Sequence, residues 1–83
     1  MYSVVITSSA EKEIRALSKE MRERIRTHIL QLRDNPRPPG GINLQGREAY
    51  RLRIGDYRIV YTIEDEVRIV SVVRIGHRRD VYR

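Results

Sequence analysis

Residues 49–63, AYRLRIGDYRIVYTI, decide the fold of this chain. In residues 49–54, AYRLRI, the alternating apolar positions are Tyr50, Leu52 and Ile54, and the polar ones between are Arg51 and Arg53. This alternation predicts a β-strand with one apolar and one polar face. Gly55-Asp56 is typical of a tight turn, and the β-branched and aromatic residues 57–63 predict a second strand. The segment is therefore predicted to form a β-hairpin.

The C-terminal residues extend this hairpin. The acidic run 64–66 predicts another turn, and residues 67–75, VRIVSVVRI, are apolar on both faces near their middle, as in a central strand. A three-stranded antiparallel meander is the expected result, followed by the short polar tail GHRRDVYR at residues 76–83.

Two short helices are predicted upstream of the meander. Residues 2–7, YSVVIT, predict a strand, after which Ser8 and Glu11 fit a capping box. Ser18 is expected to break the helix and cap a second one, which ends before Pro36. The apolar positions at helical spacing are Ala10, Ile14, Leu17, Met21, Ile25, Ile29 and Leu32. The two helices should form an αα-hairpin.

The loop at residues 35–46, NPRPPGGINLQG, holds three prolines and three glycines and is predicted to lack regular structure, with Ile42 and Leu44 docking it on the core. The expected fold class is α+β. An N-terminal strand and an αα-hairpin precede the three-stranded antiparallel meander, with the helices packed on one face of the sheet. Residues 1–83 should form a single domain.

Charge is the most informative part of the composition. Seventeen basic residues face eleven acidic ones, and all the basic residues except Lys12 and Lys19 are arginine. Arginine grips phosphate through a planar fork, so nucleic acid, acidic protein segments and anionic membranes are the partner classes favoured. The alternative is a solvated basic surface without a partner.

Other features exclude whole classes of function. The chain has no cysteine, which excludes disulfides, thiolate metal sites and cysteine nucleophiles and fits a reducing cytoplasm. No apolar run reaches the roughly 18 residues that span a bilayer. The N-terminal apolar stretch follows no basic region, so we do not expect it to be a signal peptide.

The candidate site is a cluster of arginines on the bare face of the sheet. Arg51 and Arg53 share one face of a strand, and Arg58 should lie near Arg53 after the turn, pointing the same way. Arg74 ends the last strand and precedes the run His77-Arg78-Arg79. Like charges on neighbouring strands repel unless an anion neutralises them, and a phosphodiester would supply that anion.

Each arginine of this cluster could also have a purely structural role. Arg51 and Arg53 could simply face solvent on an amphipathic strand, and Arg58 could pair with Asp56 or Asp80. The basic run after the last strand could be a solvated tail.

Histidine and tyrosine give weaker signals. Histidine is the residue type best suited to proton transfer in neutral solution, so His77 could transfer a proton, or it could be a surface residue without a role. His28 is interpreted as a core or boundary residue, and two isolated histidines without clustered carboxylates make a metal site improbable. Tyr82 could stack on a base or only anchor the C-terminus.

At this point the sequence resembles a known family. YRLRIGDYRIVYTI, followed by VVRIGHRRDVYR, closely resembles the signature of RelE-type toxins of the RelE/ParE superfamily. The upstream plan of strand, helical hairpin and proline-containing loop, and the segment Leu44-Gln45-Gly46, match as well. The likeness spans essentially the whole chain and implies a RelE-like fold.

The resemblance also implies a function. RelE toxins enter the ribosomal A site and cut mRNA there by attack of the 2′-hydroxyl on the adjacent phosphate, without metal or cofactor. By position, Arg51 and Arg53 correspond to the family's two basic strand residues, and Arg58 to the arginine that stabilises the transition state. Arg78 corresponds to the proton donor, and Tyr82 to the tyrosine that orients the nucleotide.

One departure concerns the general base. In the best-known members the first two basic positions are lysines, whereas this chain has Arg51 and Arg53 there. A guanidinium is a poor base at neutral pH. Catalysis then rests on positioning and electrostatics, which we prefer, or His77 supplies the base. Further contacts to RNA are expected from Arg47, Arg74 and Arg79.

The family also implies partners. These are a cognate RelB-like antitoxin, the ribosome and mRNA, in the cytoplasm, with no membrane, metal or small-molecule cofactor. Two rival functions stay open: a ParE-like inhibitor of DNA gyrase, and a non-catalytic homologue that binds RNA or the ribosome.

Overall fold

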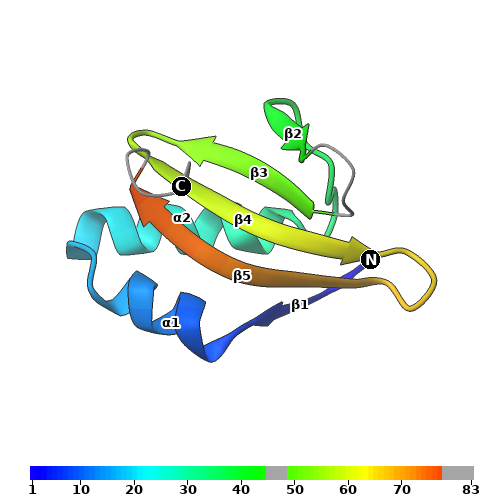
Figure 1. The fold of residues 1–83 in the computed structure, drawn as a ribbon, viewed down its shortest axis with the longest axis horizontal. Coiled ribbons are helices and arrows are strands. Elements are labelled where there is room, and N and C mark those ends of the chain that lie inside the picture. The colour runs from blue at the N-terminus through cyan, green and yellow to red at the C-terminus, as the bar shows by residue number, and fades with distance from the viewer. Residues whose placement is uncertain (45–48, 78–83) are drawn as a thin grey trace.

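The computed structural model describes residues 1–44 and 49–77. Its elements are β1 (Ser3–Ile6), α1 (Ser8–Arg15), α2 (Lys19–Gln31), β2 (Gly41–Asn43), β3 (Ala49–Ile54), β4 (Tyr57–Glu64) and β5 (Ile69–His77). The strands form one sheet in the order β1-β5-β4-β3-β2, and the chain runs through it as Figure 1 shows. The predicted α+β class, with an αα-hairpin packed on a sheet, is confirmed.

The predicted meander forms the middle of the sheet. β3 pairs antiparallel with β4, and β4 pairs antiparallel with β5. β1 pairs parallel with the far side of β5, joining Ser3 to Ile69 and Ile6 to Val72. The sheet is therefore mixed, and β5 is flanked on both sides along its first half.

One strand was not predicted. The loop at residues 35–46 was expected to lack regular structure, but Gly41–Asn43 pairs antiparallel with β3 as an edge strand. The prolines end at Pro39, so the residues after them are free to join a ladder. The expected docking of Ile42 on the core was wrong, because its side chain is 51% exposed.

The helix starts agree in part with the sequence. The predicted cap at Ser18 is confirmed, since its hydroxyl accepts the Met21 N–H at 3.2 Å. The predicted cap at Ser8 is wrong by one residue: the Thr7 hydroxyl accepts the Ala10 N–H at 3.2 Å, and Ser8 is already helical. Thr7 keeps the extended backbone of β1, which is the conformation an N-cap residue needs.

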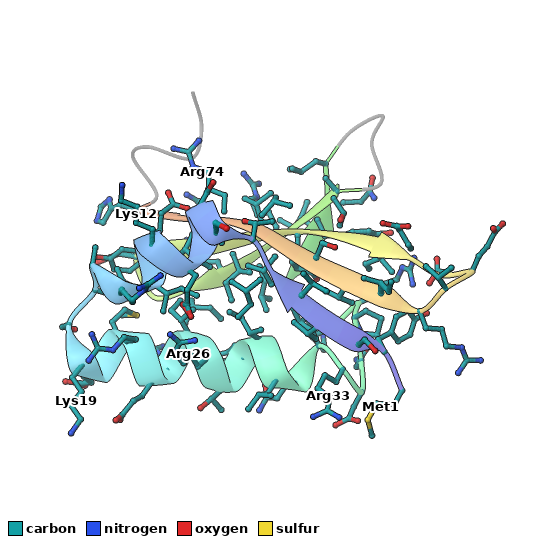
Figure 2. All side chains as sticks on the ribbon, turned by 90° about the horizontal axis from the view of Figure 1, so that it is seen from below. Met1, Lys12, Lys19, Arg26, Arg33 and Arg74 are labelled. Atoms are coloured by element: carbon teal, nitrogen blue, oxygen red, sulfur yellow. The ribbon has the colours of Figure 1, made fainter. Side chains whose placement is uncertain are left out.

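The core lies between the helices and one face of the sheet. Figure 2 shows α2 running along that face, with α1 beside it. The buried apolar residues are Ala10, Ile14, Ile25, Ile29, Leu32, Leu52, Ile54, Ile59, Tyr61, Ile63, Val70, Val72 and Ile75. Burial of each large aliphatic side chain contributes about 1.5–3 kcal/mol, so these faces fix the register of the strands. Neither helix lies over the opposite face, which we call the open face.

No helix in the described residues is long and apolar enough to cross a membrane.

A polar cluster ties three segments together at the β4–β5 turn. The Arg37 guanidinium donates two hydrogen bonds to the Asp65 carboxylate, at 3.1 and 2.8 Å, and the Tyr2 hydroxyl donates a third at 2.6 Å. The hydrogen bonds from Arg37 and then Tyr2 lower the pKa of Asp65 to about 2. The buried Tyr61 hydroxyl donates to the Pro36 carbonyl at 2.9 Å, and burial raises the pKa of Tyr61 to about 12. These contacts hold the proline loop against the sheet.

Candidate functional site

Two arginines face each other across the β3–β4 hairpin. Arg53 and Arg58 are partners in the ladder, and partners in an antiparallel pair point to the same face. Their chain neighbours Ile54 and Ile59 are buried on the helix side, so the two arginines lie on the open face. The predicted proximity of Arg58 to Arg53 is confirmed.

Arg58 is unusual for its burial. Its side chain is only 7% exposed, whereas Arg53 is exposed and donates from Nε to the Gly55 carbonyl at 3.1 Å. Arginines are seldom so buried unless they are paired or hydrogen-bonded, because desolvation of the charge is costly. Electrostatic attraction between this guanidinium and an arriving anion is correspondingly stronger than in open water.

A second row of the open face adds two more arginines. Val60 of β4 has Arg51 as its partner on β3 and Arg74 as its partner on β5. Arg51 is two residues from Arg53 on the same strand, so its side chain shares that face. Arg51, Arg53, Arg58 and Arg74 therefore come from three neighbouring strands to one surface, which we call the arginine face.

A β-bulge places Arg74 on that surface. Val72 is buried on the helix side, so strict alternation would turn Arg74 to the helix side too. The register shifts here, since Tyr61 pairs with Val72 and Val60 pairs with Arg74, which leaves Val73 as an extra residue in β5. In a bulge two residues oppose one, and the phase of the strand changes. The consecutive valines at 72–73 were the only sequence signal of this feature.

His77 is not brought to the arginine face. Its ring meets the Tyr57 ring edge-on, with 5.4 Å between the centroids and 83° between the planes. Tyr57 packs against the core, so this contact lies on the helix side. The β5 residue opposite Arg58 is Gly76. The predicted site residues Arg47, Arg78, Arg79 and Tyr82 lie outside the described residues, as does Asp80.

An apolar hollow of about 600 Å³ adjoins the arginine face. Its lining includes Leu44, Ala49, Val60 and Val73, and Val60 lies between Arg51 and Arg74 in the second row. The surface thus offers cations beside an apolar area, which suits an anionic ligand with planar or aliphatic groups. The sequence alone did not indicate the apolar part, because Val60 and Val73 lie within runs of β-branched residues that are typical of any buried strand.

A different groove, of about 570 Å³, lies between β1 and α2 and is lined in part by Val4, Ile29, Leu30 and Arg33. It contains none of the predicted site residues. We therefore assign the site from the convergence of charged groups and not from the size of the hollow. Among residues 1–44 and 49–77, no group of three or more His, Cys, Asp or Glu side chains could hold a metal ion.

Known proteins resemble this chain along nearly all of its length. Residues 4–82 match the family model described as the ParE toxin of the type II toxin–antitoxin system parDE. A RelE-like toxin protein of Escherichia coli is 34% identical over 86 aligned residues, which cover 98% of this chain and 90% of that protein.

Two solved structures share the fold. The archaeal RelE–RelB complex of Pyrococcus horikoshii aligns with a TM-score of 0.86 at 26% identity, covering 95% of this chain and 97% of that one. The intact Escherichia coli RelBE toxin–antitoxin complex aligns with a TM-score of 0.80 at 28% identity, covering 93% and 96%.

Proposed function

Since this chain belongs to the ParE toxin family, as a RelE-type toxin of the RelE/ParE superfamily, we propose that it is a ribosome-dependent mRNA endonuclease. It would inhibit translation by cutting mRNA in the ribosomal A site. The observation that carries this proposal is the buried Arg58 beside Arg53 on an open sheet face, with Arg51 and Arg74 in the next row.

The proposed reaction needs neither metal nor cofactor. The 2′-hydroxyl of one nucleotide gives up its proton to water as its oxygen attacks the adjacent phosphorus. The bond from phosphorus to the 5′-oxygen breaks, the 5′-oxygen takes up a proton, and a 2′,3′-cyclic phosphate and a 5′-hydroxyl result. Negative charge grows on the phosphoryl oxygens as the new bond forms. Fixed donors aimed at such a charge stabilise the transition state, and loss of one typically costs about 10²–10³ in rate. Arg58 is the residue we assign to this role.

The remaining roles follow the family resemblance. Arg78 would give a proton to the leaving 5′-oxygen, and Tyr82 would orient the nucleotide. Arg51 and Arg53 would hold the phosphates on either side, with Arg47, Arg74 and Arg79 contacting further RNA. The contact of His77 with Tyr57 on the helix side favours catalysis by positioning and electrostatics over a histidine base.

Dependence on the ribosome follows from the lack of a strong base among the four arginines that define the arginine face. Guanidinium groups cannot deprotonate a hydroxyl efficiently at neutral pH. The ribosome would contribute by fixing the mRNA in an in-line geometry, which removes much of the entropic barrier. We therefore expect little cleavage of naked RNA by the purified protein.

A cognate RelB-like antitoxin is the second proposed partner. The two aligned complexes pair a RelE toxin with a RelB antitoxin, and the arginine face with its apolar hollow suits an acidic, amphipathic segment. Such a segment can fold as it binds. It would neutralise the toxin by covering the arginines.

The experiment that tests the nuclease proposal is the mapping of mRNA 5′ ends after brief expression of the wild type and of Arg58→Ala. Discrete ends within codons, present for the wild type and absent for the variant, are expected. Wild-type expression that arrests growth without new mRNA ends would refute the proposal.

A gyrase inhibitor is the second candidate, because the matching family model is that of a ParE toxin. Induction of the DNA-damage response with intact mRNA would favour this candidate. Rapid arrest of protein synthesis would favour the nuclease. The presence of Arg51, Arg53 and Arg58 together at the positions of the nuclease set supports the first.

A further inference from the structure

The Glu13 carboxylate of α1 reaches two groups of β5 at once. Its Oε1 accepts the Ile75 backbone N–H at 2.9 Å, and its Oε2 lies 3.8 Å from Nε of Arg74. Figure 2 shows Arg74 beside α1. One acidic side chain therefore contacts both the backbone just after the bulge and one cation of the arginine face.

The first contact has a structural reason. β1 pairs with β5 only as far as Val72, so within the described part of the chain no strand flanks the outer edge of β5 beyond Val72. Thr7, the N-cap residue of α1, continues the pairing there: its N–H donates to the Val72 carbonyl at 3.0 Å, and its hydroxyl donates to the Val73 carbonyl at 3.4 Å. Glu13 supplies the next acceptor, for Ile75. Its Oε1 therefore replaces a strand carbonyl.

The second contact is weak enough to exchange. The side chains of Arg74 and Glu13 are 48% and 35% exposed, and the pair is separated by 3.8 Å. Exposed pairs of this kind stabilise a protein by little, since water screens both charges. An RNA phosphate that arrives at the arginine face can therefore displace Glu13 from Arg74, although at some cost in affinity.

We propose that Glu13 competes with RNA phosphate for Arg74, and so lowers the affinity of the arginine face for RNA. This inference rests on the RNA binding in the proposed function but not on cleavage. Glu13→Gln separates its two contacts, because the amide oxygen still accepts the Ile75 N–H while the negative charge is gone.

The test is a binding titration with a fluorescein-labelled 2′-O-methyl RNA oligonucleotide, which has no free 2′-hydroxyl and cannot be cut. Fluorescence anisotropy gives the Kd at several salt concentrations. We expect Glu13→Gln to tighten binding by about two- to fivefold. Arg74→Gln should weaken binding and reduce the slope of log K against log salt by about 0.7, as expected for one phosphate contact to a single strand.

The double variant decides the mechanism. The double variant, Glu13→Gln with Arg74→Gln, should bind RNA as Arg74→Gln alone does, because without the Arg74 guanidinium there is no cation for which Glu13 and RNA could compete. Glu23→Gln, on the exposed part of α2, is the control that removes one negative charge away from the site. Glu13→Asp keeps the charge but shortens the side chain, which lengthens the 3.8 Å contact with Arg74, so it should tighten binding by less than Glu13→Gln does.

The inference is overturned if Glu13→Gln gains no more affinity than Glu23→Gln, or if it gains as much in the Arg74→Gln background. Thermal melts accompany each variant, and Glu13→Asp provides a reading should Glu13→Gln not fold. A wild type that does not bind the oligonucleotide would overturn this inference and the proposed RNA binding together. Wild-type binding without an effect at Glu13 would overturn the inference alone.

Discussion

Arg53 and Arg58 occupy directly opposed positions of the β3–β4 ladder, so their side chains leave the sheet on the same face. Like charges placed this way destabilise a sheet. An anion bound between them relieves that repulsion, and a ligand that binds only the folded state raises the melting temperature.

The first prediction concerns anions. Sulfate and phosphate should raise the Tm of the wild type more than chloride does at equal ionic strength, and Arg58→Ala should lose part of this increment. Arg33→Ala removes a charge from an exposed position just after α2 and should retain this increment. Differential scanning fluorimetry measures the Tm of the wild type and of both variants in each salt. An equal rise of Tm for the wild type and for Arg58→Ala would mean that sulfate stabilises the protein only by its exclusion from the protein surface, as it does for proteins in general.

The second prediction separates chemistry from binding. Arg58→Ala should lower the single-turnover cleavage rate on programmed ribosomes by about 10²–10³-fold, because the donor aimed at the developing charge is lost. Arg53→Ala should mainly raise the concentration of protein needed for half-maximal cleavage, since its side chain is exposed and donates to Gly55. Rates at saturating and limiting protein distinguish the two effects. A larger loss of saturating rate for Arg53→Ala than for Arg58→Ala would reverse the proposed roles.

The third prediction concerns the general base. His77→Ala should leave the shape of the pH–rate profile on programmed ribosomes unchanged, because the His77 ring packs on Tyr57 and faces away from the arginine face. His77→Ala removes that aromatic contact, which is worth about 0.5–1.5 kcal/mol, so a lower Tm is expected. Loss of a limb of the profile near neutral pH would assign the base to His77 instead.

The meander was predictable because its pattern is local. Leu52, Ile54 and Ile59 alternate with the arginines, and one glycine turn fixes the register between the two strands, so the opposition of Arg53 and Arg58 followed from the sequence. Burial of one face enforces that register.

Other features depended on distant contacts. β2 forms only because β3 offers an unpaired edge. The prolines that precede β2 in the sequence predict a loop, so its residues were not recognised as a strand. The bulge at Val73 depends on which of two adjacent valines enters the core. The placement of His77 follows from that shift, since the phase of β5 after the bulge sets the face of every later residue. The contact between Glu13 and Ile75 joins residues 62 positions apart, and no local pattern indicates it.

The fourth prediction is an acid dependence of stability. The hydrogen bonds from Arg37 and Tyr2 hold the pKa of Asp65 at about 2, below its ordinary value of 3.8. A lowered pKa in the folded state means that the stabilisation by Asp65 is present above pH 3.8 and is lost as the pH falls towards 2. Asp65→Asn should therefore melt below the wild type at pH 7, with the difference shrinking between about pH 4 and pH 2.

Thermal melts across that pH range check this prediction, with Asp34→Asn as the matched loss of a carboxylate. A difference between the wild type and Asp65→Asn that stays constant down to pH 2 would show that the Asp65 charge contributes nothing to the cluster.

The fifth prediction concerns the bulge. Deletion of Val73 leaves Val72, Arg74 and Ile75 in strict alternation, so β5 should form as a regular strand and the protein should still fold. Deletion of Thr62 in β4 has no bulge to absorb it, because Thr62 is paired with Ala49 on one side and Ser71 on the other. Circular dichroism and melting curves should show a folded first variant and an unfolded or strongly destabilised second one. The opposite order would mean that the bulge is required for folding.

The parallel pairing of β1 with β5 has a consequence for biosynthesis. Residues 3–6 pair with residues 69–72, so the sheet cannot be completed before β5 has been synthesised. The nascent chain therefore cannot complete its sheet while most of β5 is still inside the ribosome that makes it. Contacts between such distant residues also form slowly. The sheet that carries the arginines is thus completed late, which leaves time for a partner protein to meet the chain first.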